Sequence, residues 1–382
     1  MQKKVLQLLI MLTVIATALT AVFIGVRAST TQINNQAQLA PHASSTAILH
    51  VQGTQIIDGS GHPLILRGAE IESAFDNMGR WQNGSRLTQV LNTTIFTVMV
   101  GDWKMNALRL CLSNWIYAKD SVNYLKLLDQ VVQKANAAGL YVVLNLHDDG
   151  TAGSPYGDNA DLPKTQDKAF WQVLATHYKS NPMVLFDLYN EPQDTSWAQW
   201  LNGGGKVAGA TVVGHLQMIN TIRTAGAKQI IIVEPGTSGG RGKGWSNFTN
   251  TIPDPNVMYS LHVYAHIADT PQQQDAKWGP ILNHHPIYYG EWALLVNGSP
   301  PQGYGFCQNI VPSQANQDVT NFLKYTASRN ANWTAWEFGA YHLIQDYTKF
   351  TPTTLNIPWK CGDPTSHAGM GTLVKQYMLT GK

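Results

Sequence analysis

Short runs of apolar residues recur along the chain from about residue 47 onward, and most of them do not alternate with polar residues. Continuous runs of this kind are typical of strands buried on both faces, as in a parallel sheet covered by helices. Counting a first strand near residues 64–70, the sequence predicts eight core strands. The other seven are expected at 106–112, 141–147, 184–190, 229–236, 257–264, 286–292 and 333–339.

Helical patterns separate several of these strands. Between residues 121 and 139 the apolar positions recur at helical spacing, at Val122, Leu125, Leu128 and Val132. Gly139 is a suitable C-cap residue for this helix, just before the next strand. Further helices are expected at 167–180, 207–226, 317–330 and 367–380.

The order of these elements predicts the architecture. Two β-rich runs on either side of the turn residues from Asp58 to Gly61 predict a short N-terminal β-hairpin. Strands that alternate with helices predict an α/β fold, a (β/α)8 TIM barrel, and residues 47–382 are long enough for one. A doubly wound open sheet is the alternative. It is disfavoured because no glycine fingerprint follows the first strand and the sequence has no phosphate-binding loop.

The composition fits a large globular domain that does not bind nucleic acid. Hydrophobic residues make up 44% of the 382 residues, whereas charged residues make up 13% and the net charge is +2. This balance provides a large core, but neither a basic surface for nucleic acid nor an acidic tail. The 12 Trp and 15 Tyr residues are a heavy aromatic content. Aromatic faces can bind sugar rings, although many of these side chains will pack in the core.

The N-terminal segment is typical of an exported protein. Lys3 and Lys4 precede a long uncharged apolar run, which ends before Arg27. A basic start followed by an apolar stretch addresses a chain to the export pathway. The sequence therefore predicts a secreted protein or an extracellular membrane-anchored one.

The fate of this segment has two interpretations, and both stay open. Residues 1–28 can be a signal peptide that is cleaved after Ala28, or residues 5–26 can stay in the membrane as an anchor. Under either interpretation, residues 29–46 are expected to be a flexible linker. Residues 47–382 are then the folded domain.

Three cysteines in an exported chain allow at most one internal disulfide. Cys307 and Cys361 are the expected pair because both lie in Gly/Pro-rich sequence. Cys111 lies in an apolar run and is expected to be a buried thiol. The sequence has no CxxC motif and no clustered Cys/His pattern that would indicate zinc.

Polar and aromatic side chains occur at or near the C-terminal ends of the predicted strands. The set comprises Arg109, His147, Asn190, Glu191, His262, Tyr264, Glu291 and Trp336. In a TIM barrel these strand ends meet on the face that carries the active site. The sequence therefore predicts a site there, with two carboxyl groups, one at the end of strand four and one on strand seven.

The expected barrel geometry brings Glu191 and Glu291 close together. Strands about 4.8 Å apart and tilted by about 36° give a radius near 7.5 Å, so strands four and seven lie roughly 14 Å apart. Side chains that reach inward by about 4 Å each leave about 6 Å between the carboxyls. This is near the range of about 5 to 5.5 Å that is typical of retaining glycosidases.

Other roles for these carboxyls stay open at this point. A buried glutamate paired with an arginine is a common structural device. Glu234 and Glu337 are rival carboxyls at strand ends. Asn190 and Glu191 are neighbours, so both can face a ligand only at a bulge or at a strand end.

A metal site has weak support in the sequence. His262 and His266 are four residues apart but belong to a predicted strand, without the intervening Glu of a helical zinc motif. His147, Asp148 and Asp149 could hold a cation at a loop. Neither pattern is specific, and we expect no metal and no cofactor.

Two short motifs resemble those of a known family. YNEP at 189–192 and YGEW at 289–292 resemble the acid/base and nucleophile motifs of glycoside hydrolase family 5, the large cellulase family. The resemblance extends over about residues 50–380. Six further positions occur where that family has its active-site set, namely Arg109, His147, Asn190, His262, Tyr264 and Trp336.

The resemblance implies a retaining hydrolase of β-linked polysaccharide, most simply an endo-β-1,4-glucanase, that needs no cofactor. Glu191 would be the acid/base and Glu291 the nucleophile in a double displacement. Arg109 would lower the pKa of Glu291. The protein is expected to be a monomer whose partner is a polysaccharide or oligosaccharide.

The other members of the set would hold the substrate. Asn190 would contact the 2-hydroxyl of the sugar, while His147 and His262 orient substrate and carboxylates. Tyr264 would donate a hydrogen bond to the nucleophile, and Trp336 would stack beneath the sugar ring. Four further tryptophans either extend this aromatic platform or pack in the core, namely Trp81, Trp115, Trp245 and Trp292.

Substrate identity and the type of function keep alternatives. The stretch RGAEIESAF at 67–75 departs from the glycine-asparagine pattern of many family members, which leaves glucan, mannan and xyloglucan open. A β-mannanase, another β-glycanase and a transglycosidase are compatible with the same motifs. A non-catalytic carbohydrate-binding protein on the same fold is the alternative outside the enzymes.

Overall fold

The computed structural model describes most of the folded region. The described residues are 48–76, 85–147, 162–193, 195–207, 209–236, 244–264, 266–294, 311–340, 342–356 and 369–381. The chain divides into two units, Met1–Gln38 and Leu39–Lys382, and all described residues lie in the second. Among them, no helix combines the length and the apolar character that a membrane span requires.

Several predictions fall outside this part of the chain. The export segment at 1–28, the linker at 29–46 and the cysteine pair Cys307 and Cys361 all lie outside the described residues. These stay predictions. Cys111, by contrast, is a buried free thiol, as its apolar surroundings in the sequence indicated.

Eight parallel strands close into a barrel, which confirms the predicted fold. Their order around the ring is β10-β11-β12-β13-β4-β5-β6-β7. The strands are β4 (Arg67–Phe75), β5 (Ala107–Leu112), β6 (Tyr141–Leu146), β7 (Val184–Asp187), β10 (Ile231–Val233), β11 (Val257–Val263), β12 (Ile287–Trp292) and β13 (Asn332–Ala335). All eight overlap the predicted strands, although β4 begins later and extends further than expected.

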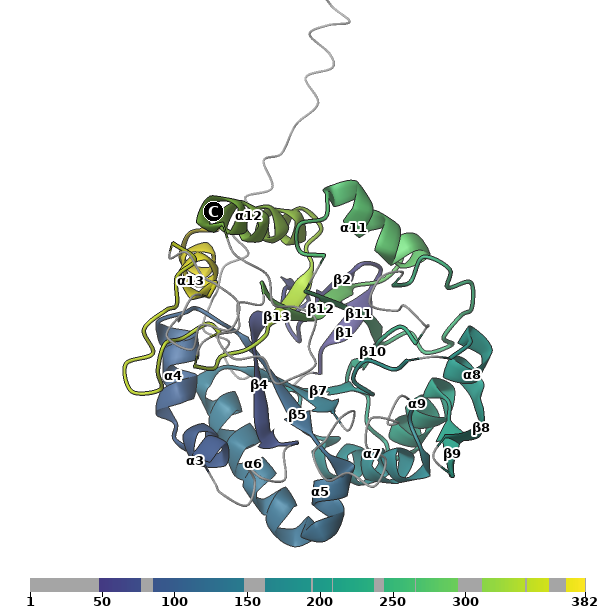
Figure 1. Cartoon of the computed structure of the whole chain (residues 1–382). Helices are drawn as coiled ribbons and strands as arrows, with labels where there is room; N and C mark the ends of the chain where they lie inside the picture. Colours follow the sequence, from purple (N-terminus) through teal and green to yellow (C-terminus); the bar gives the residue numbers. More distant parts are fainter. Residues whose placement is uncertain are drawn as a thin grey trace, which may run out of the picture. The chain divides into compact units, whose positions relative to one another are not determined.

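Helices surround the barrel (Figure 1). They are α3 (Ser85–Leu91), α4 (Thr94–Gly101), α5 (Asn114–Lys119), α6 (Ser121–Ala138), α7 (Thr165–Tyr178), α8 (Trp197–Asn202), α9 (His215–Thr224), α11 (Pro271–Trp278), η2 (Gly279–Ile281), α12 (Pro312–Ser328) and α13 (Gly371–Thr380). In α6 the Asp120 side chain accepts a hydrogen bond from the Asn123 amide and caps the first turn. Gly139 ends the helix with φ of 102°, as the C-cap prediction requires.

The helix predicted over 207–226 is wrong in its first part. α9 begins at His215, and the preceding segment forms a two-stranded antiparallel sheet of β8 (Gly203–Val207) and β9 (Ala210–Val213). Gly209, inside the predicted helix, has φ of 80°, and β9 contains the β-branched run Thr211 to Val213. Both features oppose a helix, because glycine is flexible and β-branched side chains prefer strands.

The predicted N-terminal hairpin is a three-stranded antiparallel sheet of β1 (His50–Gln52), β2 (Gln55–Ile57) and β3 (Pro63–Leu64). Leu49, Ile56 and Leu64 share an apolar cluster with barrel side chains such as Ile230 and Met258. This small sheet therefore covers the interior of the barrel at the end opposite the strand C-termini.

Strands β5, β6, β7 and β10 are buried at every residue, as the continuous apolar runs predicted. On β5, Leu108, Leu110 and Leu112 belong to the large outer cluster that includes the helices. The alternate residues Arg109 and Cys111 face the barrel interior, where Arg109 contacts side chains from other strands. Toward the strand N-termini the interior is apolar, and Ile230, Ile232 and Met258 form one cluster there with the N-terminal sheet, which we call the apolar floor. The polar interior residues lie on the C-terminal side of this floor.

Candidate active site

Arg109 connects five side chains at the centre of the barrel. It is fully buried, and its Nε donates to Asp187 Oδ2 at 2.9 Å. Its Nη1 donates to Glu291 Oε1 at 2.6 Å and also to Glu70. Its Nη2 donates to Asn190 Oδ1 at 2.9 Å and to Glu234 Oε1 at 3.2 Å. One guanidinium thus ties four carboxylates and one amide from different strands, in the fork geometry that suits arginine.

Glu291 lies on β12, where its environment favours the ionised form. Burial alone would raise the pKa of Glu291, but the charges of His262 and Arg109 outweigh it and hold this pKa well below its usual value. The Tyr264 hydroxyl also donates a hydrogen bond to Glu291 Oε2. The pattern is typical of a carboxylate kept ready for nucleophilic attack.

Glu191 follows the end of β7, four residues beyond Asp187, the last paired position. Its φ is 42°, in the left-handed region that is uncommon for non-glycine residues. This turn lets Asn190 and Glu191 both face the site, as expected for a strand end. The amide of Glu191 donates to Glu234 Oε2 at 2.9 Å, and Glu191 Oε1 lies 3.1 Å from His262 Nδ1.

The two glutamates lie close together. Glu191, His262 and Glu291 each offer a ligand atom within 4.8 Å of the others. His262 Nδ1 lies 3.4 Å from Glu291 Oε2, so the histidine sits between both carboxyls. Register shifts occur in β11 next to His262 and in β12 next to Glu291, and such irregularities re-aim side chains at barrel rims.

The two histidines of the site carry different charges. Burial opposes the charge on His262, but Glu234 and Glu291 raise its pKa well above the usual value, which favours the protonated form. Burial lowers the pKa of His147 to about 4, so its imidazole is neutral. His147 Nδ1 lies 3.1 Å from Asn145 Oδ1, and its Nε2 lies 3.3 Å from Asn190 Nδ2.

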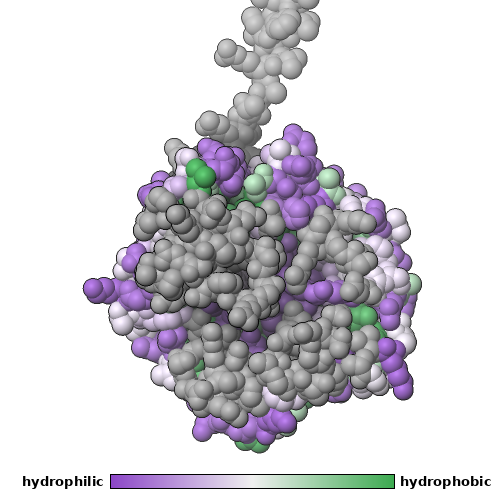
Figure 2. Space-filling model, viewed as in Figure 1, coloured by the Kyte–Doolittle hydropathy of each residue, from purple (hydrophilic) through white to green (hydrophobic). Residues whose placement is uncertain are grey.

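Aromatic side chains differ in their access to the site. Trp336 is half-buried just after β13, and its ring packs edge-to-face on Tyr264 with centroids 6.0 Å apart. Trp245 and Trp292 are fully buried in the core, so a platform role for these two is wrong. Trp115 is partly buried on α5, with Lys119 over its ring. Trp81 lies outside the described residues. Figure 2 shows hydrophilic side chains toward the centre of the face viewed, between the segments drawn in grey.

A family model described as cellulase, glycosyl hydrolase family 5, matches residues 57–342. The chain belongs to glycosyl hydrolase family 5. This confirms the resemblance carried by the YNEP and YGEW motifs.

Relatives of this family 5 chain are distant. It is 26% identical to a cellulase/esterase of Acetivibrio thermocellus over 248 residues, which cover 58% of this chain and 30% of that protein. It is 25% identical to an endoglucanase of Paenibacillus polymyxa, with 78% and 86% covered. Among solved structures, a β-glucanase of Saccharophagus degradans matches with a TM-score of 0.64 at 22% identity, covering 88% of this chain and 94% of that one. The chain spans 30 to 43% of the length of the first three curated relatives.

Sequence reasoning missed two members of this family 5 site. Asp187 and Glu70 are fully buried partners of Arg109. Asp187 had a signal, because it is a lone charge inside the apolar run VLFDLYN. Burial raises the pKa of Asp187 to about 7, although Arg109 opposes this, and burial with the charge of Glu291 raises that of Glu70 well above its usual value.

The other candidate carboxyls, Glu234 and Glu337, and His266 of the weak metal pattern have protein partners in the structure. Glu234 accepts hydrogen bonds from Arg109 and from the backbone amide of Glu191, so it helps to position Glu191. Glu337 Oε2 accepts a hydrogen bond from the Glu72 amide at 3.1 Å. His266 Nδ1 lies 3.5 Å from Asp269. Asp148 and Asp149 lie outside the described residues.

Proposed function

We propose that this protein hydrolyses β-linked glucan chains and retains the anomeric configuration. Glu291 acts as the nucleophile, and Glu191 as the acid/base. The observation that supports this most is the short spacing of the two carboxyls, whose nearest oxygens lie within 4.8 Å. Retaining glycosidases hold their carboxyl groups about 5 to 5.5 Å apart, whereas inverting enzymes need about 6.5 Å or more to admit a water molecule.

The first step forms a covalent intermediate. The ionised Glu291 attacks the anomeric carbon while Glu191 gives its proton to the departing glycosidic oxygen. The bond between the two sugars breaks, and its electrons stay with the leaving oxygen. Arg109 and Tyr264 hold Glu291 in place for this attack through their hydrogen bonds to its two oxygens.

The second step returns the enzyme to its starting state. Once Glu291 is esterified its charge is lost, and Glu191 is ionised more easily. Glu191 then takes a proton from water, which attacks the anomeric carbon and releases Glu291. The charged His262 lies beside both glutamates and stabilises whichever one is ionised.

Asn190 is suited to hold the 2-hydroxyl of the reacting sugar. Its Oδ1 is fixed by Arg109 at 2.9 Å, and its Nδ2 lies 3.3 Å from His147 Nε2. We propose that a sugar oxygen accepts a hydrogen bond from Asn190 Nδ2. Hydrogen bonds to this hydroxyl strengthen as the ring approaches the oxocarbenium ion. Trp336 would stack under the same ring.

A β-1,4-glucan is the proposed substrate class. Several relatives carry the name endoglucanase, and a solved β-glucanase of the same fold was crystallised with cellotetraose. β-Mannan is the nearest alternative because the same pair of carboxyls serves any equatorial β-linkage. The specificity of the distal subsites decides between the two.

The test is product analysis on carboxymethylcellulose, glucomannan, galactomannan, xyloglucan and laminarin, with the first anomer followed by proton NMR. We expect reducing ends from carboxymethylcellulose, released first as the β-anomer. The α-anomer as the first product would overturn double displacement. No release from any polymer would favour a non-catalytic carbohydrate-binding protein.

A further inference from the structure

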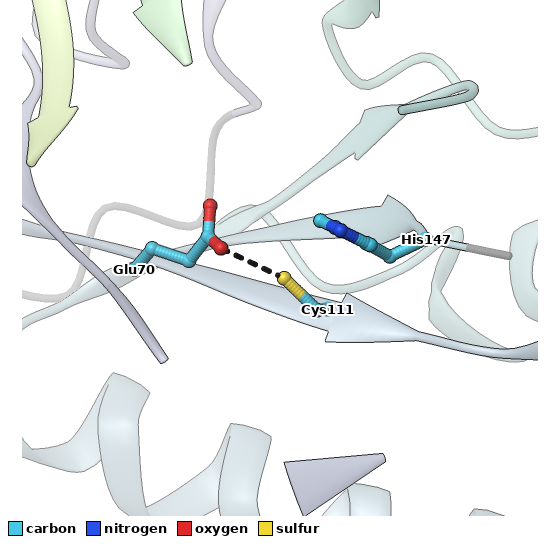
Figure 3. Close-up of side chains that lie close together, drawn as sticks. All are labelled: Glu70, Cys111 and His147. Atoms are coloured by element: carbon cyan, nitrogen blue, oxygen red, sulfur yellow. Dashed lines mark hydrogen bonds between the residues drawn. The ribbon is translucent and has the colours of Figure 1, made fainter. Parts of the chain in front are cut away.

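Glu70, Cys111 and His147 form a second cluster on the wall of the barrel (Figure 3). They come from β4, from β5 and from the residue after β6, three neighbouring strands. Figure 3 shows the side chains directed toward one another. Cys111 Sγ donates to Glu70 Oε1 at 3.1 Å, and one ligand atom from each residue lies within 4.8 Å of the other two.

We propose that these three side chains bind a soft divalent cation of the Zn²⁺ class, and that the bound ion inhibits the enzyme. Zn²⁺ accepts sulfur, nitrogen and oxygen donors, and three protein ligands would leave a fourth position for water. Zn–S bonds of about 2.3 Å and Zn–N bonds of about 2.0 Å place ligand atoms about 3.5 Å apart in a tetrahedron. Side-chain movements of about 1 Å would bring the cluster to that spacing.

Neighbouring groups already orient two of the ligands. Arg109 Nη1 bonds Glu70 Oε2, which leaves Oε1 directed at the thiol. Asn145 Oδ1 accepts from His147 Nδ1, so Nε2 carries the ring's lone pair, which in this structure accepts from Asn190 Nδ2. Metal-binding histidines commonly have such a partner on the other ring nitrogen, because it fixes the tautomer.

The charge around the cluster favours a cation despite Arg109. Four buried carboxylates surround that single guanidinium, namely Glu70, Asp187, Glu234 and Glu291. A bound cation would favour the ionised forms of these carboxyls, and their charge then offsets the repulsion between the ion and Arg109. The thiol selects against Mg²⁺ and Ca²⁺, which prefer oxygen ligands only. Binding breaks the Cys111 S–H bond, the proton leaves to the solvent, and the sulfur electron pair bonds the metal.

The bound ion would act on the glycosidase site through His147 and Glu70. His147 Nδ1 lies 4.0 Å from Glu291 Oε1, and Glu70 shares Arg109 Nη1 with Glu291. Coordination through His147 Nε2 would replace its 3.3 Å contact with Asn190 Nδ2. The inhibition rests on the proposed hydrolysis, whereas the binding of the ion does not.

Co²⁺ titration of the full chain tests the binding itself. We expect one equivalent of Co²⁺ to give a thiolate-to-metal charge-transfer band in the near ultraviolet, which Zn²⁺ then removes by displacement. C111S should lose the band, keep glycosidase activity without metal, and resist Zn²⁺ inhibition by at least about tenfold. No band in the wild type, or the same band in C111S, would overturn the proposal.

Two further variants keep the test independent of folding defects in C111S. C307S/C361S leaves Cys111 as the one cysteine of three in the sequence, so its band should persist. H147Q keeps the thiol but removes the imidazole, so Co²⁺ should bind about tenfold to a hundredfold more weakly. Loss of the band in C307S/C361S, or unchanged affinity in H147Q, would contradict the site.

Discussion

The two proposed catalytic glutamates have the same side chain but different surroundings. Glu291 accepts hydrogen bonds from Arg109 and Tyr264, and it lies next to the protonated His262. Glu191 is held through its backbone amide by Glu234 and through its carboxyl by His262. The hydrogen bonds of Arg109 and Tyr264 to Glu291 support the proposed roles, because a nucleophile needs a stabilised negative charge whereas an acid must start with a proton.

Substitution of Glu191 separates these roles. E191A should lower turnover of a natural glucan by about 10² to 10⁴-fold, because the leaving oxygen loses its proton donor. Azide should restore activity toward a glycoside with an activated leaving group. A 2-fluoro glycoside should label Glu291, located by peptide mass spectrometry. A label on Glu234, or no azide rescue, would contradict this assignment.

A buried histidine outside the site should control acid stability. Burial lowers the pKa of His215 to about 3, while its hydrogen bond to the Trp200 carbonyl opposes this. Its Nε2 has no hydrogen-bond partner within the described ranges, so a proton there would be buried and unpaired. The unfolded chain takes up that proton below about pH 6.5, so stability is lost as pH falls from 6.5 toward 3.

The expected slope for His215 is at most about 1.4 kcal/mol of unfolding free energy per pH unit. Urea unfolding between pH 7 and pH 4 measures it. H215Q cannot titrate and should show a shallower loss with acid. An identical slope in wild type and H215Q would show that other groups, such as His147, account for it.

At the scale of elements, the strands were predictable because each is short, apolar and buried on both faces. The prediction failed at 207–214 because Gly209 has a positive φ and the β-branched run Thr211 to Val213 favours a strand over a helix. β4 was placed too early, since the charges in RGAEIESAF hid a strand in which Glu70 faces Arg109 in the barrel interior. The pattern of apolar residues predicts the presence of a strand or helix better than it predicts the residues at which that element begins and ends.

Part of the candidate site could likewise be predicted from the sequence, and part could not. The eight polar and aromatic residues at strand ends were found because each one interrupts or ends an apolar run. Glu70 could not be assigned a partner, since Arg109 lies 39 residues away and the contact exists only once β4 and β5 pair. The Glu70, Cys111 and His147 cluster is hidden for the same reason. Its members share no local motif and meet only across neighbouring strands.

At the scale of the whole molecule, the apolar cluster that stabilises the barrel and the residues proposed for catalysis lie at opposite ends of it. Ile56 of the N-terminal sheet and Ile230 of the barrel belong to one apolar cluster, the floor. The charged network lies toward the strand C-termini. In TIM barrels the catalytic groups belong to the C-terminal face and the other face serves stability. Substitutions in the floor should therefore change stability without changing the reaction.

Ile56 provides the test, because it is only 1% exposed and lies in the floor cluster. I56A should lower the unfolding free energy by about 2 to 5 kcal/mol, since it removes buried methyl groups and leaves a cavity. Its kcat on carboxymethylcellulose should equal that of wild type well below the melting temperature. V122A is the control, because Val122 is 80% exposed and its change should stay within about 0.5 kcal/mol. A tenfold fall in kcat for folded I56A would mean that the floor and the site are coupled through the barrel.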